Sequence, residues 1–292
     1  MNVIVCVKQV LDNSSPVKIA KDGRHIDGTN TGYIINPCDL AAVKWATNWK
    51  ERSKSGEVAV ISKNGPSTGK ILRECFAYGA DRALLLTDLD FEDSDGFATG
   101  LILARAIKLL EYDIILCGIQ AVDTNDGWVG PVVANKLGIP LISRVIDIQV
   151  DEIKKKVTVR RRLDGVNREI VEADVPCLLT VDSLLDEPRY ASIRSIRMAQ
   201  RREIEQHDRI SLGLSKEDVG TIGSKTSILE LFAGKLRPGR IFIPDSSLPA
   251  AERIRLIMSG GITEKRENRL EGNPEETIPD LIQFLRQKKI IR

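Results

Sequence analysis

Four polar loops carry the side chains and backbone amides that are best suited to binding a ligand. Each loop follows a short apolar run and precedes a helical pattern. The loops are Asn36–Asp39, Asn64–Ser67, Asp95–Thr99 and Gly118–Pro131. In the last loop, glycines allow close backbone approach, amides at a helix start can meet an anion, and Asp123 and Thr124 can hydrogen-bond hydroxyl groups. This pattern predicts a cradle for phosphate and ribose, although an ordinary glycine-rich connection has the same composition.

Side chains suited to catalysis are scarce. Only His25 and His207 are present, and the five cysteines are scattered without a CxxC pair, which argues against a metal site or a Cys/His nucleophile. Cys38 lies near a helix start, but no histidine supports a nucleophile there, so we expect it to pack or to line a cofactor. No strand is followed by GxGxxG, which excludes a Rossmann fingerprint, and no GxSxG elbow occurs.

Composition and charge narrow the classes of partner. The chain has 292 residues, is 42% hydrophobic and 29% charged, and carries a net charge of +2. This balance gives no argument for a nucleic acid or for insertion into a membrane. The N-terminus enters a strand at once without a basic leader, so we expect no signal peptide. Unpaired cysteines in apolar segments indicate reduced thiols and a cytoplasmic protein.

Short apolar runs alternate with amphipathic segments over the first half of the chain. The expected strands are 3–7, 58–61, 83–86 and 113–117. Expected helices follow Asp39 and Asp95 as N-caps, start at Pro66, and cover 127–137. Fully apolar strands in this alternation predict an open, mostly parallel α/β sheet with helices on both faces. Ligands bind such sheets at the carboxyl ends of the strands, where the four polar loops fall.

The second half of the chain has a different pattern of apolar and polar residues. Runs at 145–150, 157–161 and 168–171 predict an antiparallel extension of the sheet, closed by a strand at 177–181. A basic helix is expected near Ile196–Glu205, and the final piece holds the segments Ile228–Phe232 and Ala250–Met258 and a helix at Glu275–Gln287. The tail has too few apolar residues for a core of its own. We therefore expect a domain at 1–190, a linking segment at 191–225, and a C-terminal arm at 226–292 that packs on another chain.

Two segments together resemble a known family. The run Val175–Ile193 resembles the hallmark stretch of electron transfer flavoprotein beta subunits, and Glu187-Pro188-Arg189-Tyr190-Ala191 is its most specific part. The Gly118–Pro131 loop looks like the nucleotide-binding loop of that family, and Val5–Val10 and Asn36–Asp39 fit in the expected order. The resemblance implies an adenine-nucleotide-binding, HUP-like sheet and a C-terminal arm that packs on a partner subunit.

The resemblance also implies partners and site residues. Such beta subunits pair with a larger alpha subunit that holds a redox-active FAD, and they bury an adenine nucleotide of their own. The residues implied to contact that nucleotide or line its pocket are Cys6, Asn36, Cys38, Asp39, Asn64, Asp95, Thr99, Gln120, Asp123, Thr124, Gly127, Trp128, Val129, Gly130 and Pro131. Those implied to dock onto a flavin-dependent dehydrogenase are Tyr190, Ser192, Ile193, Ile196 and Arg197, with Ile193 as the apolar anchor.

The identity of the nucleotide depends on the branch of the family. One branch holds AMP in the beta subunit, whereas another, associated with flavin-based electron bifurcation, holds a second FAD and reacts with NADH. Asn36–Asp39 and Asp95–Thr99 look like the second branch, whereas Gly96, Gly100 and Trp128 depart from it. We expect FAD, with AMP as the alternative, in an electron carrier rather than a stand-alone enzyme.

The rival function is an ATP-binding enzyme or a nucleotide sensor of the same architecture. Such a protein needs a glycine-containing phosphate loop after the first strand. The segment Lys8–Ser15 occupies that position and contains no glycine. The sequence therefore favours the carrier.

Overall fold

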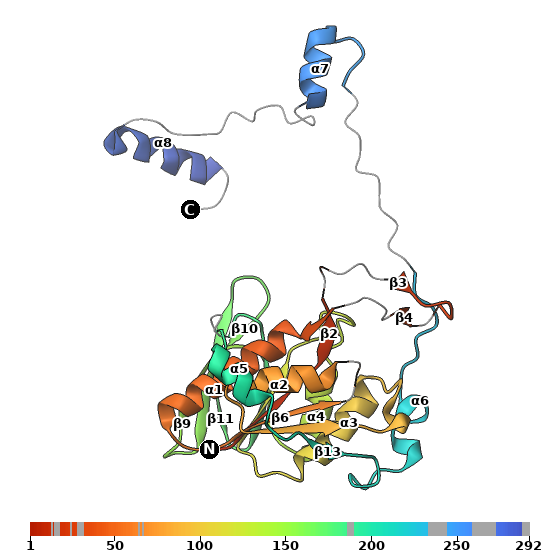
Figure 1. Cartoon of the computed structure of the whole chain (residues 1–292). Helices are drawn as coiled ribbons and strands as arrows, with labels where there is room; N and C mark the ends of the chain where they lie inside the picture. The colour runs from red at the N-terminus through yellow and green to blue at the C-terminus, as the bar shows by residue number, and fades with distance from the viewer. Residues whose placement is uncertain are drawn as a thin grey trace. The chain divides into compact units, whose positions relative to one another are not determined.

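The apolar runs form the centre of a nine-stranded sheet in the described part of the chain, as the computed structural model shows (Figure 1). The strand order is β11-β10-β9-β12-β8-β1-β6-β7-β13. The strands with parallel neighbours are β1 (Val3–Cys6), β6 (Val58–Lys63), β7 (Arg82–Leu86), β8 (Ile114–Gly118), β12 (Cys177–Val181) and β13 (Glu205–His207). The extension comprises β9 (Leu141–Asp151), β10 (Lys156–Arg162) and β11 (Arg168–Asp174), and it is antiparallel. The predicted fold class is confirmed.

The structure describes residues 1–12, 14, 18–23, 25–27, 32–63, 65, 67–185, 190–232, 244–258 and 273–287. The chain divides into two units, residues 1–233 and 234–292, and each is described by itself. The sheet and every predicted site residue belong to the first unit.

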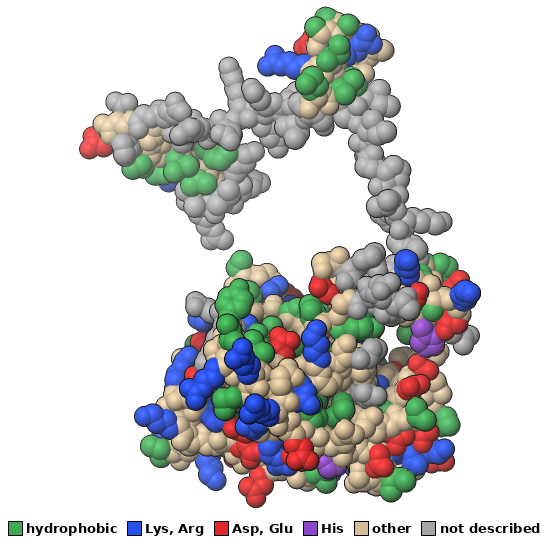
Figure 2. Space-filling view, in the orientation of Figure 1, with side chains coloured by type: hydrophobic (Ala, Val, Ile, Leu, Met, Phe, Trp, Pro, Cys, Tyr) green, Lys and Arg blue, Asp and Glu red, His purple; other side chains and the backbone are tan. Residues whose placement is uncertain are grey.

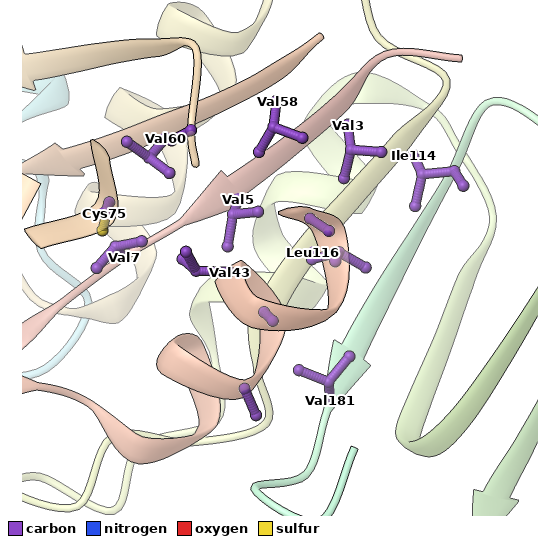
Figure 3. Close-up of a cluster of buried hydrophobic side chains, with 14 of the residues drawn as sticks. Val3, Val5, Val7, Val43, Val58, Val60, Cys75, Ile114, Leu116 and Val181 are labelled. Carbon is purple, nitrogen blue, oxygen red and sulfur yellow. The ribbon is translucent and has the colours of Figure 1, made fainter. Parts of the chain in front are cut away.

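Helices cover both faces of the sheet because strand side chains alternate between the two. Val3 and Val5 of β1 join one buried cluster with α1 (Pro37–Ser53) and α2 (Thr68–Tyr78), where Val43 of α1 meets the strand valines (Figure 3). Ile4 and Cys6 of the same strand join a second cluster with α3 (Gly96–Ile107) and α4 (Val129–Leu137). The carboxyl ends of the strands are thereby held between two helical layers.

The strand at Cys177–Val181 differs from its prediction. It does not close the antiparallel extension; it lies inside the sheet as β12, parallel to β8 on one side and to β9 on the other. All its side chains are buried, which a strand achieves only where both of its faces are covered. The prediction that this strand closes the antiparallel extension was wrong for this reason.

The helix expected near Ile196–Glu205 is also different. Helix α5 covers Ile193–Ala199 and begins earlier because the Ser192 side chain accepts a hydrogen bond from the Ser195 amide. The chain then forms β13, which joins the sheet beside β7, where Arg82 makes a bidentate ion pair with Glu205 at 2.8 Å. This tertiary pairing overrides the helical pattern.

Arg73 of α2 fixes the end of α5. Its Nη1 donates to the carbonyl oxygens of Ala199, Gln200 and Arg202 at 3.3, 2.9 and 3.1 Å. The guanidinium of Arg202 in turn lies over the Phe76 ring and donates to the Asp81 carbonyl. One cation therefore satisfies the carbonyls that a helix end leaves free.

We expect an Arg73→Met variant to loosen α5 while leaving the sheet intact. Hydrogen bonds to a charged donor contribute about 2 kcal/mol, so amide exchange in Ile193–Ala199 should accelerate on the order of thirtyfold. Hydrogen exchange followed by mass spectrometry measures this, with peptides from β1 as the internal reference. Unchanged exchange in α5 would contradict the assigned role of Arg73.

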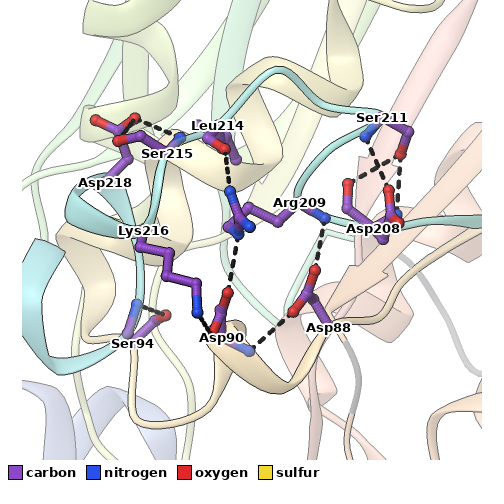
Figure 4. A network of polar contacts seen from close by, with 11 residues as sticks. Asp88, Asp90, Ser94, Asp208, Arg209, Ser211, Leu214, Ser215, Lys216 and Asp218 are labelled. Atoms are coloured by element: carbon purple, nitrogen blue, oxygen red, sulfur yellow. Dashed lines mark hydrogen bonds and ion pairs between the residues drawn. The ribbon is translucent and has the colours of Figure 1, made fainter.

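The segment after β13 is bound to the loop that follows β7 (Figure 4). The Arg209 side chain donates to Asp90 at 2.9 Å and to the Leu214 carbonyl at 2.8 Å, and its amide donates to Asp88. Lys216 approaches Asp90 at 3.7 Å. The short helices involved are η1 (Leu89–Phe91), η2 (Lys216–Asp218) and α6 (Gly220–Gly223). This network holds the loop that leads into α3.

Part of the loop expected between β1 and the first helix is ordered as two small antiparallel pairs. They consist of β2 (Gln9–Leu11) with β5 (Tyr33–Ile35), and β3 (Lys18–Ile19) with β4 (Ile26–Asp27). His25 contacts Asp22 at 2.5 Å and Asp93 at 3.1 Å, and these contacts raise its pKa. The second hairpin is thereby attached to the loop after β7.

The second unit contains α7 (Ala250–Met258) and α8 (Pro274–Gln287), and α8 agrees with the helix expected at Glu275–Gln287. No described side chain of either helix is buried, and Ile254, Ile257, Ile278 and Leu281 are exposed. Among the described residues, none of the helices combines the length and apolar character needed to traverse a lipid bilayer.

Candidate functional site

Asp39 joins the carboxyl ends of two central strands. Its Oδ2 accepts a hydrogen bond from the Lys8 amide after β1, and its Oδ1 accepts one from the Gly118 amide at the end of β8, both at 2.8 Å. It is therefore not the N-cap of α1, as the sequence suggested; Asn36 holds that position. The carboxylate lies inside the first turn of the helix and is buried, so it fixes the rim of the sheet.

Asn36 fastens the loop after β8 to the same helix start. Its Nδ2 donates to the Gln120 carbonyl at 3.0 Å, and its Oδ1 accepts from the Val122 amide at 3.2 Å. The Asn36 backbone amide also donates to the Lys8 carbonyl at 2.9 Å. Only 1% of Asn36 is exposed, so its side chain is committed to shaping the loop. The Gln120 side chain is exposed.

Three cysteines lie at or just below this rim. Cys6 and Cys117 occupy neighbouring strands, and the adjacent Cys6 thiol together with burial raises the pKa of Cys117. Burial and the charge of Asp39 raise the pKa of Cys38. Neutral, buried thiols are poor nucleophiles, so these side chains pack and line the rim.

Burial raises the pKa of Asp39 to about 7, against the opposing hydrogen bonds from Lys8, Asn36 and Gly118. A carboxyl whose pKa is higher in the fold than in the unfolded chain favours folding while it is neutral. Its contribution is therefore complete below about pH 4 and is lost as the pH rises through about 7.

We expect this titration to appear in a comparison with an Asp39→Asn variant. The free energy of unfolding of the wild type minus that of the variant should fall by up to about 4 kcal/mol between pH 4 and pH 8. Urea denaturation across this range measures the difference. A difference that does not change with pH would show that Asp39 titrates at its ordinary value.

The loop 119–128 leads to the start of α4 and carries the predicted phosphate contacts. Asp123 Oδ1 lies 2.7 Å from Lys8 Nζ and also accepts a hydrogen bond from the Thr124 amide. No acceptor is recorded among the described residues for the amides of Gly127, Val129 and Gly130. Such amides at a helix start attract an anion. Pro131, in the next position of the helix, has no amide hydrogen to offer.

The glycines between the end of β8 and the start of α4 differ in what requires a residue without a side chain. A Cβ on Gly118 would lie 2.2 Å from Asp39 Oδ1, and one on Gly130 would lie 2.5 Å from Thr180 Cγ2. Close packing inside the protein therefore requires both glycines. At Gly127 a Cβ would meet only the Ile119 carbonyl, at 3.0 Å. The backbone approach to a ligand that the sequence suggested for Gly130 is thus not the reason for that glycine.

Gly96 and Gly100 allow α3 to pack closely on α4. A Cβ at Gly96 would lie 2.5 Å from Asp126 Oδ2, and one at Gly100 would lie 2.6 Å from Val132 Cγ1. Trp128, which begins α4, is 54% exposed. Gly96, Gly100 and Trp128 are the positions at which the sequence departs from the family pattern. In the structure they lie where the start of α3 packs closely against the start of α4.

Asp95 and Thr99 lie at the start of α3, and their polar groups bond within the protein. Asp95 Oδ1 caps the helix by accepting from the Phe97 and Ala98 amides, as predicted. Its Oδ2 accepts from the Lys225 and Thr226 amides, and these hydrogen bonds outweigh burial and lower the pKa of Asp95. Thr99 Oγ1 donates to the Ser94 carbonyl at 3.3 Å. Asn64, the remaining predicted contact, lies outside the described residues.

Two lysines of the rim were missed by the sequence reasoning. Lys8 follows β1 and Lys63 ends β6, and the parallel register places these positions side by side. Lys63 Nζ donates to the Phe91 carbonyl at 3.1 Å. The signal was present, because each lysine is a charged residue at or just beyond the end of a largely apolar strand.

The predicted docking residues lie on and before α5. Tyr190 is 89% exposed and Ile193 is 74% exposed, and Ile196 and Arg197 are also exposed. Ser192 caps the helix, and Glu187, Pro188 and Arg189 lie outside the described residues. Figure 2 shows basic side chains on the face of the first unit that carries α1, α2 and α5. The structure thus presents apolar side chains of α5 on a basic surface.

Two cavities of the first unit, lined by described residues, lie away from this rim. One, of about 250 Å³, is lined by α3, Lys136 and Asp218; the other, of about 220 Å³, lies around Asn2 and Glu57 at the opposite ends of the strands. The described residues contain no cluster of three His, Cys, Asp or Glu that could hold a metal. We assign the candidate site to the rim because its polar groups converge there.

Comparison with known proteins agrees with this architecture. The family described as the electron transfer flavoprotein domain matches residues 25–212. The chain is 37% identical to the electron transfer flavoprotein subunit beta of Megasphaera elsdenii, covering 83% of this chain and 91% of that protein. It is 35% identical to the caffeyl-CoA reductase-Etf complex subunit CarD of Acetobacterium woodii (82% and 90% covered). It is 34% identical to the protein FixA of Azotobacter vinelandii (84% and 89% covered). The chain therefore belongs to the family of electron transfer flavoprotein beta subunits.

Proposed function

We propose that this chain binds an adenine nucleotide at the rim and, with an alpha subunit that carries FAD, passes electrons between a flavin-dependent dehydrogenase and an acceptor. The observation that carries the proposal is the construction of the rim. The Asp39 side chain accepts hydrogen bonds from the ends of β1 and β8, and the Asn36 side chain is hydrogen-bonded to the loop 119–122. The amides of the next segment remain available to a ligand.

The residues at the rim fit an adenine nucleotide. The amides of Gly127, Val129 and Gly130 supply donors for a phosphate at the start of α4, and Lys8 adds a positive charge nearby. The Asp123 carboxylate can accept hydrogen bonds from ribose hydroxyls, and the hydroxyl of the exposed Thr124 can donate or accept one. When the nucleotide is FAD, the flavin supplies the redox chemistry and the chain's own residues bind and orient it.

We assign FAD to this site, with AMP as the alternative, and a second FAD to the alpha subunit. The motifs Asn36–Asp39 and Asp95–Thr99 support the branch that uses two flavins. Electron bifurcation with NADH as donor belongs to the same proposal. One flavin plus one AMP per heterodimer, measured after denaturation by chromatography and absorbance, would refute the FAD assignment.

The exposed apolar side chains of α7 and α8 support the proposal that this chain works with an obligate partner subunit. Helices that bury none of their described side chains within their own unit gain stability by covering them on another chain. We assign this surface to the alpha subunit and the α5 surface to the dehydrogenase. The five free, buried cysteines fit a reducing compartment, the cytoplasm.

Redox cycling of the co-expressed heterodimer tests the carrier function. Flavin absorbance should bleach on reduction and return when an acceptor is added, and neither subunit alone should turn over. The rival, an ATP-using enzyme, predicts hydrolysis of ATP by this chain by itself. The segment after β1, where this rival needs a phosphate-binding loop, instead forms the strand β2 over Gln9–Leu11. Measurable ATP hydrolysis by this chain would favour the rival.

A further inference from the structure

Asp95 joins the start of α3 to a segment that lies far away in the sequence. Its Oδ1 accepts hydrogen bonds from the Phe97 and Ala98 amides at 3.0 and 2.9 Å. Its Oδ2 accepts one from the Lys225 amide at 2.7 Å, and two from the amide and the hydroxyl of Thr226 at 2.8 and 2.9 Å. A carboxylate offers about four lone pairs to donors. These hydrogen bonds therefore use the full acceptor capacity of Asp95, and none remains for a hydroxyl group of a ligand.

The segment bound by Asp95 leads into the second unit of the chain. Residues 224–232 form neither helix nor strand, so their order depends on contacts with other parts of the first unit. The Asp95 amide donates to Ser224 Oγ at 2.9 Å, and the Leu231 amide donates to the Gly23 carbonyl at 2.8 Å. Both ends of the segment are thus fixed, and Asp95 makes most of the hydrogen bonds at the first end.

The ordered segment carries apolar side chains in exposed positions. Ile228, Leu229 and Phe232 are all largely exposed. The chain continues from them to α7 and α8, whose exposed apolar side chains are assigned above to the alpha subunit. A segment whose backbone is already ordered loses less conformational entropy when it binds. Fixing residues 224–232 in advance should therefore strengthen the association of the two subunits.

We propose that Asp95 is a positioning residue for subunit assembly. Its carboxylate holds residues 224–232 at the start of α3, in the conformation that binds the alpha subunit, and it does not bind the nucleotide. This inference rests on the alpha-subunit partner of the proposed function. It gives Asp95 a role different from the nucleotide contact that the family resemblance implies, because its second set of donors lies about 130 positions away and is brought to it only by the fold.

An Asp95→Asn variant separates the two roles of this side chain. Asparagine caps a helix about as well as aspartate, so α3 keeps its first turn. The amide group that replaces Oδ2 is itself a donor and faces the donors of Lys225 and Thr226, so the long-range contact is lost. We expect amide exchange in residues 224–232 of the full chain to accelerate on the order of tenfold or more. Exchange of subunits between labelled and unlabelled heterodimers should accelerate to a similar degree.

A second pair of variants tests the contact from its other side. Thr226→Val removes one donor to Asp95 and leaves the cap of α3 intact, so it should accelerate both kinds of exchange by a smaller factor. Thr226→Ser keeps the hydroxyl and should behave as the wild type. The matched control for the loss of a carboxylate is Asp164→Asn, whose fully exposed side chain lies between β10 and β11. It should also behave as the wild type.

The outcomes separate this inference from the proposed function. Wild-type rates of subunit exchange in both Asp95→Asn and Thr226→Val would overturn the role in assembly, even if amide exchange accelerates. Loss of the adenine nucleotide from Asp95→Asn at an unchanged rate of subunit exchange would show that Asp95 is a ligand of the nucleotide instead. If the wild-type chain forms no complex with an alpha subunit, the proposed function is wrong and this inference with it.

Discussion

Replacing Gly118 by alanine is expected to destabilise the protein by about 2–3 kcal/mol and to release the nucleotide from the rim. The added Cβ would lie 2.2 Å from Asp39 Oδ1 and 2.9 Å from Cys38 Cβ. Both neighbours are buried in the first turn of α1 and have little room to move. The carboxylate must therefore leave the amides of Lys8 and Gly118, and the ends of two strands lose their connection.

Urea denaturation and adenine content of the purified heterodimer measure the two consequences. The matched control is Gly69→Ala in α2, where an added Cβ has nothing within 4 Å. That change should be neutral or stabilising by up to about 1 kcal/mol. Wild-type stability and full nucleotide content in Gly118→Ala would contradict the role given to the contact between α1 and β8.

Changing Ile193 to aspartate is expected to lower kcat/KM for electron exchange with the dehydrogenase by about thirtyfold or more. An apolar anchor at the centre of an interface contributes about 2 kcal/mol or more, and Ile193 is largely exposed at the start of α5. The side chain makes no contribution to the core, so the fold and the nucleotide should be unaffected.

The control for this substitution is Ile153→Asp. Ile153 is 96% exposed in the turn between β9 and β10. The control therefore makes the same substitution of an exposed isoleucine on a different surface. The control should exchange electrons at the wild-type rate. Equal loss in both variants, or no loss in either, would remove α5 from the docking surface. Flavin content and reduction by dithionite, measured in parallel, should be unchanged in both.

The central fold was accessible from the sequence because its strands are apolar on both faces and alternate with amphipathic helices. The same reasoning failed for β12, because a strand that returns to the interior has the same composition as one that ends a sheet. It also missed β13, whose residues Glu205, Gln206 and His207 show no apolar pattern. That strand exists through its pairing with β7 and the ion pair between Arg82 and Glu205.

At the candidate site, too, some features could be predicted from the sequence and others could not. Local chemistry predicted the cap at Asp95, which the structure contains. The same argument failed at Asp39, because its partner Gly118 is 79 positions away and the contact exists only in the folded sheet. The residues predicted to contact the nucleotide came from a family resemblance, and most of those described gather at one rim. Their contact with a ligand stays a prediction.

Adenine content of the purified heterodimer is the decisive measurement for a nucleotide at the rim. The two subunits are denatured together, and the released adenine compounds are separated and counted against the protein concentration. We expect two adenine groups per heterodimer, one of them lost selectively in Gly118→Ala. A single adenine group, retained in full by that variant, would show that the rim of this subunit holds no nucleotide.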